Sequence, residues 1–288
     1  MPDDQEEVRG PAVRRRQLGR TLRDLRKAAG LSSLKAAHER TGFSTATLSR
    51  IEAAKQVILP RTVRSLCQAY GIGAPTLDHL LRLAEESEYR GWTLDFSDTV
   101  PDYAGRYVGE EDDAQEIWSY EQEYVQGPLQ TPAYCRAVSA ISDPDVTEEK
   151  LDRLVELRQA RQQRLINRPS QQLIAVVNEG ALHRQVGGRA VMNEQLRRLA
   201  ELAELPNIDV LVLPFAAGAH PAMSGSFSML HFPAEIGDPT IYVELDHGAL
   251  YPDRPVDFDR RTWMFTELRR LALPTADSVA LVSSLVRE

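Results

Sequence analysis

The sequence predicts an α+β protein in which an all-α N-terminal domain precedes a larger α+β domain. Residues up to about 87 carry apolar side chains at helical spacings, and the rest of the chain mixes such spacings with short β-branched runs. A length of 288 residues is also enough for two domains. We place these domains at 13–87 and 88–288, after a tail at 1–12 that we expect to be disordered.

Five short helices are predicted in the N-terminal domain. The first, at 14–29, has apolar residues at intervals of 4, 3 and 4, and Gly30 is suited to cap its C-terminus. The others are expected from 32 or 33 to 40, at 44–55, at 60–70 and at 75–86. The last two would complete a small core with these residues: Val63, Leu66, Cys67, Tyr70, Leu77, Leu80, Leu81 and Ala84.

The segment Gly42–Glu52 has the pattern of the turn and second helix of a helix-turn-helix. Gly42 permits a sharp bend, and the Ser44 hydroxyl can accept from an unpaired amide at the start of the helix. Leu48 and Ile51 share one face. The opposite face carries short or basic side chains: Thr45 at its edge, Ala46, Ser49, Arg50 and Ala53. Such a helix fits the major groove, so the segment predicts binding to double-stranded DNA.

The charge distribution along the chain supports this hypothesis. The net charge is −8, yet residues 8–70 hold 14 Lys or Arg and 3 acids, whereas the rest holds 20 bases and 39 acids. An asymmetry of this size indicates that one region faces a polyanion. A merely solvated basic surface is the competing interpretation.

The remaining bulk features predict an ordinary globular protein in the cytoplasm. No run of about 18 apolar residues indicates a membrane span, and residues 1–7 lack the pattern of a secretory signal. Cys67 and Cys135 are far apart and have no ligand spacing, so we expect two buried apolar side chains and no metal site or cofactor.

The C-terminal domain is predicted to contain a small sheet flanked by helices. Residues 85–113 are poorly periodic and rich in aromatic side chains, which indicates a connection, and 127–132 has the composition of a turn. Helices are expected at 114–123, at 132–141, from a capping box of Asp145 and Glu148 to 165, at 190–205, at 258–273 and at 275–286. Strands are expected at 173–178, 207–214, 226–232 and 240–245, in a sheet of three or four strands.

Catalysis is the less favoured function class for this domain. The chain lacks the motifs of hydrolases, metalloproteases, redox proteins and nucleotide-binding proteins, so we expect no enzyme. If the domain were an enzyme, the candidate catalytic side chains would be these: His220, His231, His247, Glu179, Glu244 and Asp246. A row of Arg158, Arg161 and Arg164 is open to three interpretations: a solvated helix face, intramolecular salt bridges or a site for an acidic partner. The first two are favoured together.

The N-terminal domain resembles the xenobiotic-response-element family of regulators. The resemblance is carried by residues 22–32, 42–44, 48–52 and 70–71. It implies the five-helix fold of the phage repressors and an ion pair between Arg26 and Glu52. It also implies that Thr45, Ala46, Ser49 and Arg50 face bases, with Arg50 contacting guanine, and that Ser33 and Lys55 approach phosphates.

Two positions depart from that family. His38 stands four residues before the turn glycine, where a small residue is usual, and Ala54 replaces a glycine that often follows the glutamate. Either the second helix begins later than usual, or His38 occupies the contact between the helices with some strain.

The rest of the chain resembles the large domain that follows the helix-turn-helix in many actinobacterial regulators described as antitoxin-like. The matching segments include 126–131, 158–165, 178–182, 186–188, 212–214, 218–220 and 242–244. This resemblance implies a small protein partner or an effector for residues 88–288.

These observations predict a sequence-specific transcriptional regulator that binds double-stranded DNA as a homodimer and whose C-terminal domain senses a protein partner or ligand. The alternative is an antitoxin-like interaction protein that binds a small protein encoded nearby and uses DNA binding for autoregulation. A small-molecule sensor would use a pocket near Trp92–Tyr107 or near the strand ends at His220 and His247.

Overall fold

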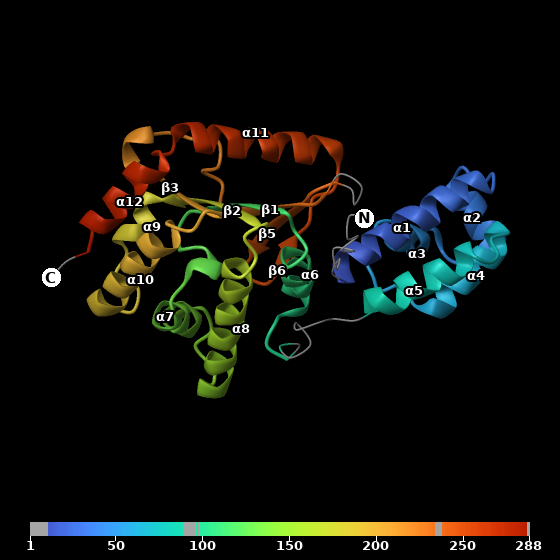
Figure 1. The fold of residues 1–288 in the computed structure, drawn as a ribbon, viewed down its shortest axis with the longest axis horizontal. Helices are drawn as coiled ribbons and strands as arrows, with labels where there is room; N and C mark the ends of the chain where they lie inside the picture. The colour runs from blue at the N-terminus through green and yellow to red at the C-terminus, as the bar shows by residue number, and fades with distance from the viewer. Residues whose placement is uncertain (1–10, 89–95, 97, 234–237, 287–288) are drawn as a thin grey trace, which may run out of the picture. The chain divides into compact units, whose positions relative to one another are not determined.

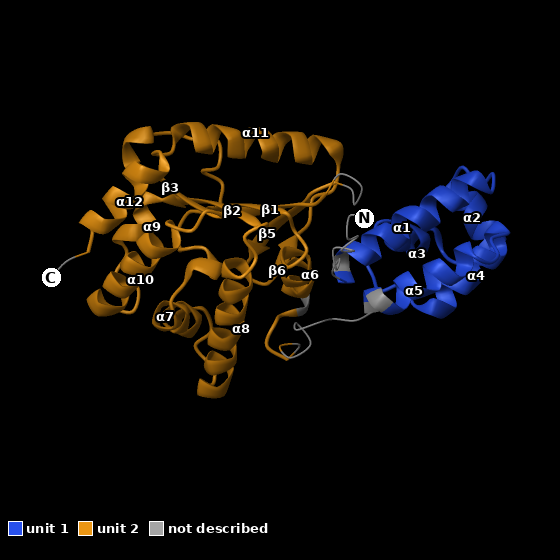
Figure 2. Ribbon diagram, viewed as in Figure 1, with its two compact units in different colours: residues 1–94, 234–237 blue, residues 95–233, 238–288 orange. Residues whose placement is uncertain are grey.

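Figure 1 shows the computed structural model of the chain, which describes residues 11–88, 96, 98–233 and 238–286. These residues form two compact units, coloured separately in Figure 2. The described part of the N-terminal unit is 11–88, and the rest belongs to the C-terminal unit. Residues 1–10 of the predicted tail lie outside the described residues, and the first helix already begins at Pro11.

The N-terminal unit is all-helical, as predicted. Its helices in chain order are α1 (Pro11–Ala28), α2 (Leu34–Thr41), α3 (Thr45–Glu52), α4 (Pro60–Tyr70) and α5 (Thr76–Glu88). Gly30 and Gly42 take left-handed φ values of 79° and 76° after α1 and α2, which only glycine adopts at little cost. One apolar cluster built around Leu18, Leu22 and Leu66 joins the helices.

The C-terminal unit contains one mixed sheet of six strands in the order β3-β2-β1-β4-β5-β6. The strands are β1 (Glu116–Glu121), β2 (Gln172–Asn178), β3 (Ile208–Leu213), β4 (Phe227–His231), β5 (Thr240–Leu245) and β6 (Gly248–Leu250). Strands β1, β2 and β3 run parallel, whereas β4, β5 and β6 continue the sheet in antiparallel pairs. The prediction of α+β architecture is confirmed, and the expectation of three or four strands is wrong.

Helices cover both faces of this sheet. They are α6 (Asp102–Glu111), α7 (Pro132–Ser142), α8 (Glu148–Ile166), α9 (Glu179–His183), α10 (Arg189–Leu202), α11 (Pro255–Leu271) and α12 (Thr275–Ser284). Short 3₁₀ turns lie at η2 (Gly127–Leu129) and η3 (Phe215–Ala217). In Figure 1, α11 lies on one face of the sheet, and α6, α7 and α8 lie on the other.

The largest error of the sequence prediction concerns the middle of the sheet. Residues 114–123 were expected to form a helix, but they contain β1, which pairs with β2 on one side and β4 on the other. A six-residue strand with polar residues on both faces carries no clear alternation, so its neighbours decide its structure.

Two smaller predictions in this unit are also wrong. The segment 85–113 was expected to be a connection, yet it contains α6. Helix α8 is capped by Thr147, whose hydroxyl accepts from the Lys150 amide, and not by a box of Asp145 and Glu148. Tyr89 and Trp92 of the aromatic segment lie outside the described residues.

Among the residues that the structure describes, no helix combines the length and apolar character that crossing a membrane requires.

Candidate functional site

Helix α3 exposes the side chains that were predicted to read DNA. Thr45, Ala46, Ser49 and Arg50 are all exposed, and they share a surface because Leu48 and Ile51 on the other side are 1% and 0% exposed. The Arg50 Nε donates to the carbonyl of Ala46 at 3.3 Å, within the same helix. The helix thus presents one guanidinium among short side chains, which leaves its backbone free to approach a groove closely.

The turn before α3 is held by local hydrogen bonds. The Ser44 hydroxyl accepts from the Thr47 amide at 3.1 Å, which is the predicted N-cap. His38 is exposed, and its Nδ1 lies 2.8 Å from the carbonyl oxygen of Phe43. The buried contact of α2 is made by Ala37, which is 0% exposed. Helix α2 begins at Leu34, slightly after the expected start at 32 or 33, and His38 does not occupy the contact between the helices.

Arg26 of α1 and Glu52 of α3 form a two-point ion pair. The Nε and Nη2 of Arg26 donate to the two Glu52 oxygens at 2.6 and 3.0 Å, and Nη1 donates to the Leu31 carbonyl. Hydrogen bonding to Glu52 raises the pKa of Arg26. Burial and then the Glu52 charge raise the pKa of the neighbouring Tyr70 to about 12. The pair connects the end of α3 to α1, although desolvation offsets part of its attraction.

The backbones of α1 and α3 also approach closely, at Gly19. A methyl group at this position would lie 2.6 Å from the Ile51 carbonyl oxygen and 3.1 Å from that of Glu52. Just beyond, Ala54 is buried and has a φ of 53°, in the region that favours glycine. Sequence reasoning missed Gly19, because nothing in a helical pattern distinguishes a glycine needed for close packing from a tolerated one.

The predicted phosphate contacts are Ser33, which precedes α2, and Lys55, which follows α3. Ser33 is exposed and caps α2, its hydroxyl accepting from the Ala36 amide at 3.1 Å. Lys55 is exposed just after α3, and its amide donates to the Arg50 carbonyl at 2.8 Å. A hydroxyl at a helix N-terminus and an exposed ammonium both suit phosphate oxygens.

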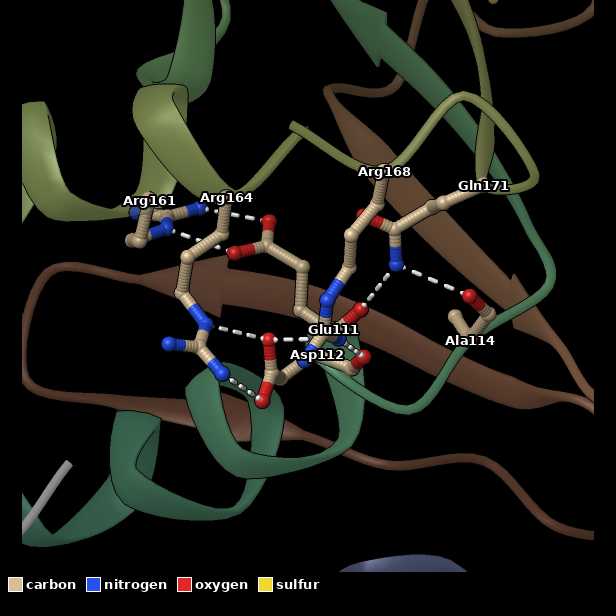
Figure 3. Close-up of polar contacts among 7 residues, drawn as sticks. All are labelled: Glu111, Asp112, Ala114, Arg161, Arg164, Arg168 and Gln171. Atoms are coloured by element: carbon tan, nitrogen blue, oxygen red, sulfur yellow. Dashed lines mark hydrogen bonds and ion pairs between the residues drawn. The ribbon is translucent and has the colours of Figure 1, made fainter. Parts of the chain in front are cut away.

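In the C-terminal unit, the arginine row of α8 is used mainly for ion pairs with the end of α6. Figure 3 shows Arg161 bound to Glu111 at 2.6 and 2.7 Å and Arg164 bound to Asp112 at 2.5 and 2.8 Å. The first pair is buried; burial alone would lower the pKa of Arg161, but the charge and hydrogen bonds of Glu111 raise it. Of the three interpretations, intramolecular salt bridges apply to Arg161 and Arg164. They do not apply to Arg158, which forms no ion pair within the described ranges.

The loop 126–131, which carries part of the sequence resemblance, is fastened by glutamines. Gln162 of α8 donates to the Pro128 and Gln130 carbonyls at 2.8 and 3.3 Å. Gln195 of α10 donates to the Leu129 carbonyl at 2.8 Å and accepts from the Thr131 amide at 2.8 Å. These buried contacts give the loop a structural role in joining α8 and α10 to the sheet.

The six candidate catalytic side chains take part in separate contacts. The ring of His231 is tilted against that of Trp118, with centroids 4.2 Å apart, and His220 lies edge-on to Tyr120. Burial lowers the pKa of both histidines. Glu179 accepts from the Phe215 amide at 2.6 Å. The other three are exposed on or beside the β5–β6 hairpin: Glu244, Asp246 and His247. Within the described ranges, no group of three or more His, Cys, Asp or Glu side chains is arranged to hold a metal ion.

Comparison with known proteins agrees with this division. Residues 17–80 match the family model of a helix-turn-helix domain, and residues 104–284 match that of a domain of unknown function, DUF5753. No curated protein and no solved structure matches the chain. The helix-turn-helix match supports a DNA-binding regulator. Because the second model covers more than half of the sequence, the chain belongs to the family of proteins with the DUF5753 domain of unknown function.

Proposed function

We propose that this protein is a sequence-specific transcriptional regulator of the xenobiotic-response-element type, whose DUF5753 domain controls when α3 binds DNA. The observation that carries the proposal is the exposed face of α3, where Arg50 stands among Thr45, Ala46 and Ser49. The opposite face of this helix is packed by Leu48 and Ile51 and joined to α1 by the Arg26–Glu52 pair. A rigid helix that presents one guanidinium, which can donate two parallel hydrogen bonds, suits guanine in the major groove.

The proposed active form is a homodimer acting in the cytoplasm on a pair of half-sites. Helix-turn-helix proteins gain affinity when two recognition helices enter the major groove one helical turn apart. The basic part of the chain supports such binding, because 14 Lys or Arg and only 3 acids lie between residues 8 and 70. The same charges predict that affinity falls steeply with salt.

The first prediction tests the recognition helix with a matched pair of variants. Arg50→Ala is expected to weaken binding to the operator by about 1–3 kcal/mol and to relax the preference for one base pair. Arg82 is an exposed arginine of α5, so Arg82→Ala removes the same charge away from α3 and is expected to bind almost as wild type. Fluorescence anisotropy with DNA from upstream of the gene, against scrambled DNA and over a series of salt concentrations, measures both effects. Equal affinity and base preference in wild type and Arg50→Ala would show that α3 is not the reading helix.

The antitoxin-like alternative makes a different prediction about residues 88–288. It requires a small protein partner that copurifies with the chain and changes its DNA affinity.

A further inference from the structure

The two faces of the central strands in the C-terminal unit differ sharply in polarity. Toward α11, β1, β4 and β5 contribute an apolar cluster: Trp118, Tyr120, Phe227, Met229, Ile241 and Val243. Toward α6 and α8, the paired residues Ser119, Ser228 and Tyr242 form a row across the same three strands. All three are buried, at 5%, 6% and 6% exposure. A sheet face covered by helices is normally apolar, so this row requires an explanation.

The polarity of this face increases toward the carboxyl end of β1. One row back lie Ile117, Leu230 and Thr240, and one row forward lies Glu121, hydrogen-bonded to Ser226. In open sheets with parallel strands, ligands bind outside the carboxyl ends of those strands. Side chains on this face therefore become more polar toward the carboxyl end of β1, which is where a ligand would be expected.

Most of the inner part of this polar face is held by contacts within the protein, although the buried Tyr242 hydroxyl has no hydrogen-bond partner in the described structure. The Ser228 and Ser119 hydroxyls lie 3.3 Å apart, and the Tyr242 ring stacks on Tyr107 of α6 at 4.4 Å. The guanidinium of Arg161, which is paired with Glu111, lies over the Tyr107 ring at 5.7 Å from its centroid.

The outer layer contains further polar groups with unused hydrogen-bonding capacity. The Arg158 guanidinium has no hydrogen bond or ion pair to any residue within the described ranges, and it lies so close to Gly127 that a side chain there would collide with it. Gln126 is 2% exposed, and in the described structure its Oε1 has no donor, although its Nε2 donates to the Val176 carbonyl at 2.9 Å. The pKa of Glu121 is raised to about 7, mainly by burial; hydrogen bonding to Ser226 opposes the rise, the charge of Glu244 adds to it, and the charge of Arg158 opposes it.

We propose that the carboxyl end of β1 binds a small zwitterion with an ammonium and a carboxylate group, of the class of free amino acids. The Arg158 guanidinium donates hydrogen bonds to the carboxylate of the ligand, and the ammonium of the ligand lies between Glu121 and the Gln126 Oε1. Arginine matches a carboxylate with two parallel hydrogen bonds, and an ammonium supplies a positive charge beside Glu121 and the donor that the Gln126 Oε1 lacks. Gly127 leaves room for the Arg158 guanidinium in its present position. The binding site stands on the C-terminal unit alone, whereas its use as an effector site rests on the proposed regulatory function.

The test is a calorimetric and thermal-shift titration of the full-length protein with single free L-amino acids, in the absence of DNA. At least one is expected to bind saturably and raise the melting temperature. Arg158→Ala and Glu121→Gln are each expected to weaken that binding about tenfold or more, because each removes a charged contact. Arg269 is exposed on α11, across the sheet, so Arg269→Ala serves as the matched control and should leave binding unchanged.

Gly127→Ala provides a second variant that keeps every charge but displaces the Arg158 guanidinium, and it is expected to weaken binding while circular dichroism shows the native fold. The proposal is overturned if no amino acid binds, if Arg158→Ala binds as wild type, or if acetate or a simple amine binds as tightly as the zwitterion. Binding without an effect on DNA affinity would retain the site and remove its effector role. Failure to bind DNA would leave the calorimetric result untouched.

Discussion

At the scale of single residues, Ala54 illustrates how backbone conformation selects an amino acid. Its φ of 53° costs an L-residue roughly 1–2 kcal/mol, and its methyl group is buried at 7% exposure. Ala54→Gly is expected to change the free energy of unfolding by less than about 1 kcal/mol, because relief of φ strain offsets lost burial and added chain entropy. Ala54→Val is expected to cost about 2 kcal/mol or more, since a β-branched residue is strongly disfavoured at this φ. Urea denaturation measures both, and a stable Val variant would contradict the argument.

Glu121 predicts a pH dependence of stability. Its pKa is raised in the folded protein from 4.5 to about 7 by burial, with Ser226 and Arg158 opposing and Glu244 adding to the rise. The folded state therefore binds more protons than the unfolded state between these values, and stability falls as pH rises through this window. Glu121→Gln cannot lose a proton there. Between pH 5 and pH 8 its melting temperature is expected to gain about 2–4 °C relative to wild type, as measured by calorimetry. A constant difference across this range would show that Glu121 is not desolvated.

At the scale of elements, the position of α3 depends on its contact with α1 at Gly19. A methyl group there meets two backbone carbonyl oxygens of α3, which cannot rotate away as a side chain can. Gly19→Ala is expected to destabilise the N-terminal unit by about 1–3 kcal/mol and to weaken DNA binding, because α3 shifts from its scaffold. A methyl group added at Gly73 would meet no described atom within 4 Å beyond its chain neighbours, so Gly73→Ala is the control and should preserve both stability and affinity. Urea denaturation and anisotropy decide the matter, and equal behaviour of the two variants would contradict it.

The elements also show which local signals were sufficient. Helix α3 was predictable because its cap Ser44, its turn glycine and its buried pair Leu48 and Ile51 all lie within ten residues. Strand β1 was not predictable, because its structure depends on hydrogen bonds to β2 and β4, far along the chain. Strand β3 was predictable, because its apolar run lies within one segment that ends at a proline. Its contact with α12 was not predictable: the Val212 amide donates to the Ser278 hydroxyl at 2.9 Å.

At the scale of the whole molecule, the chain joins a basic helical unit to an acidic α+β unit. This division was evident in the uneven distribution of the −8 net charge and in the change of apolar spacing along the chain. The exposed surface of α3 followed from the same local reasoning, since alternate faces of a short helix are determined by spacing alone.

The sequence by itself therefore determined the α+β class, the helix-turn-helix and the residues on its exposed face, because each depends on neighbours within a few turns of helix. Only the tertiary structure decided that α3 packs closely against Gly19 and that Arg161 and Arg164 pair with the end of α6. It also decided that Arg158 forms no ion pair with any described residue, although it lies beside Gly127 and Glu121. These features arise where distant segments meet. Burial and charge at such meeting points depend on the packed chain and not on any local pattern.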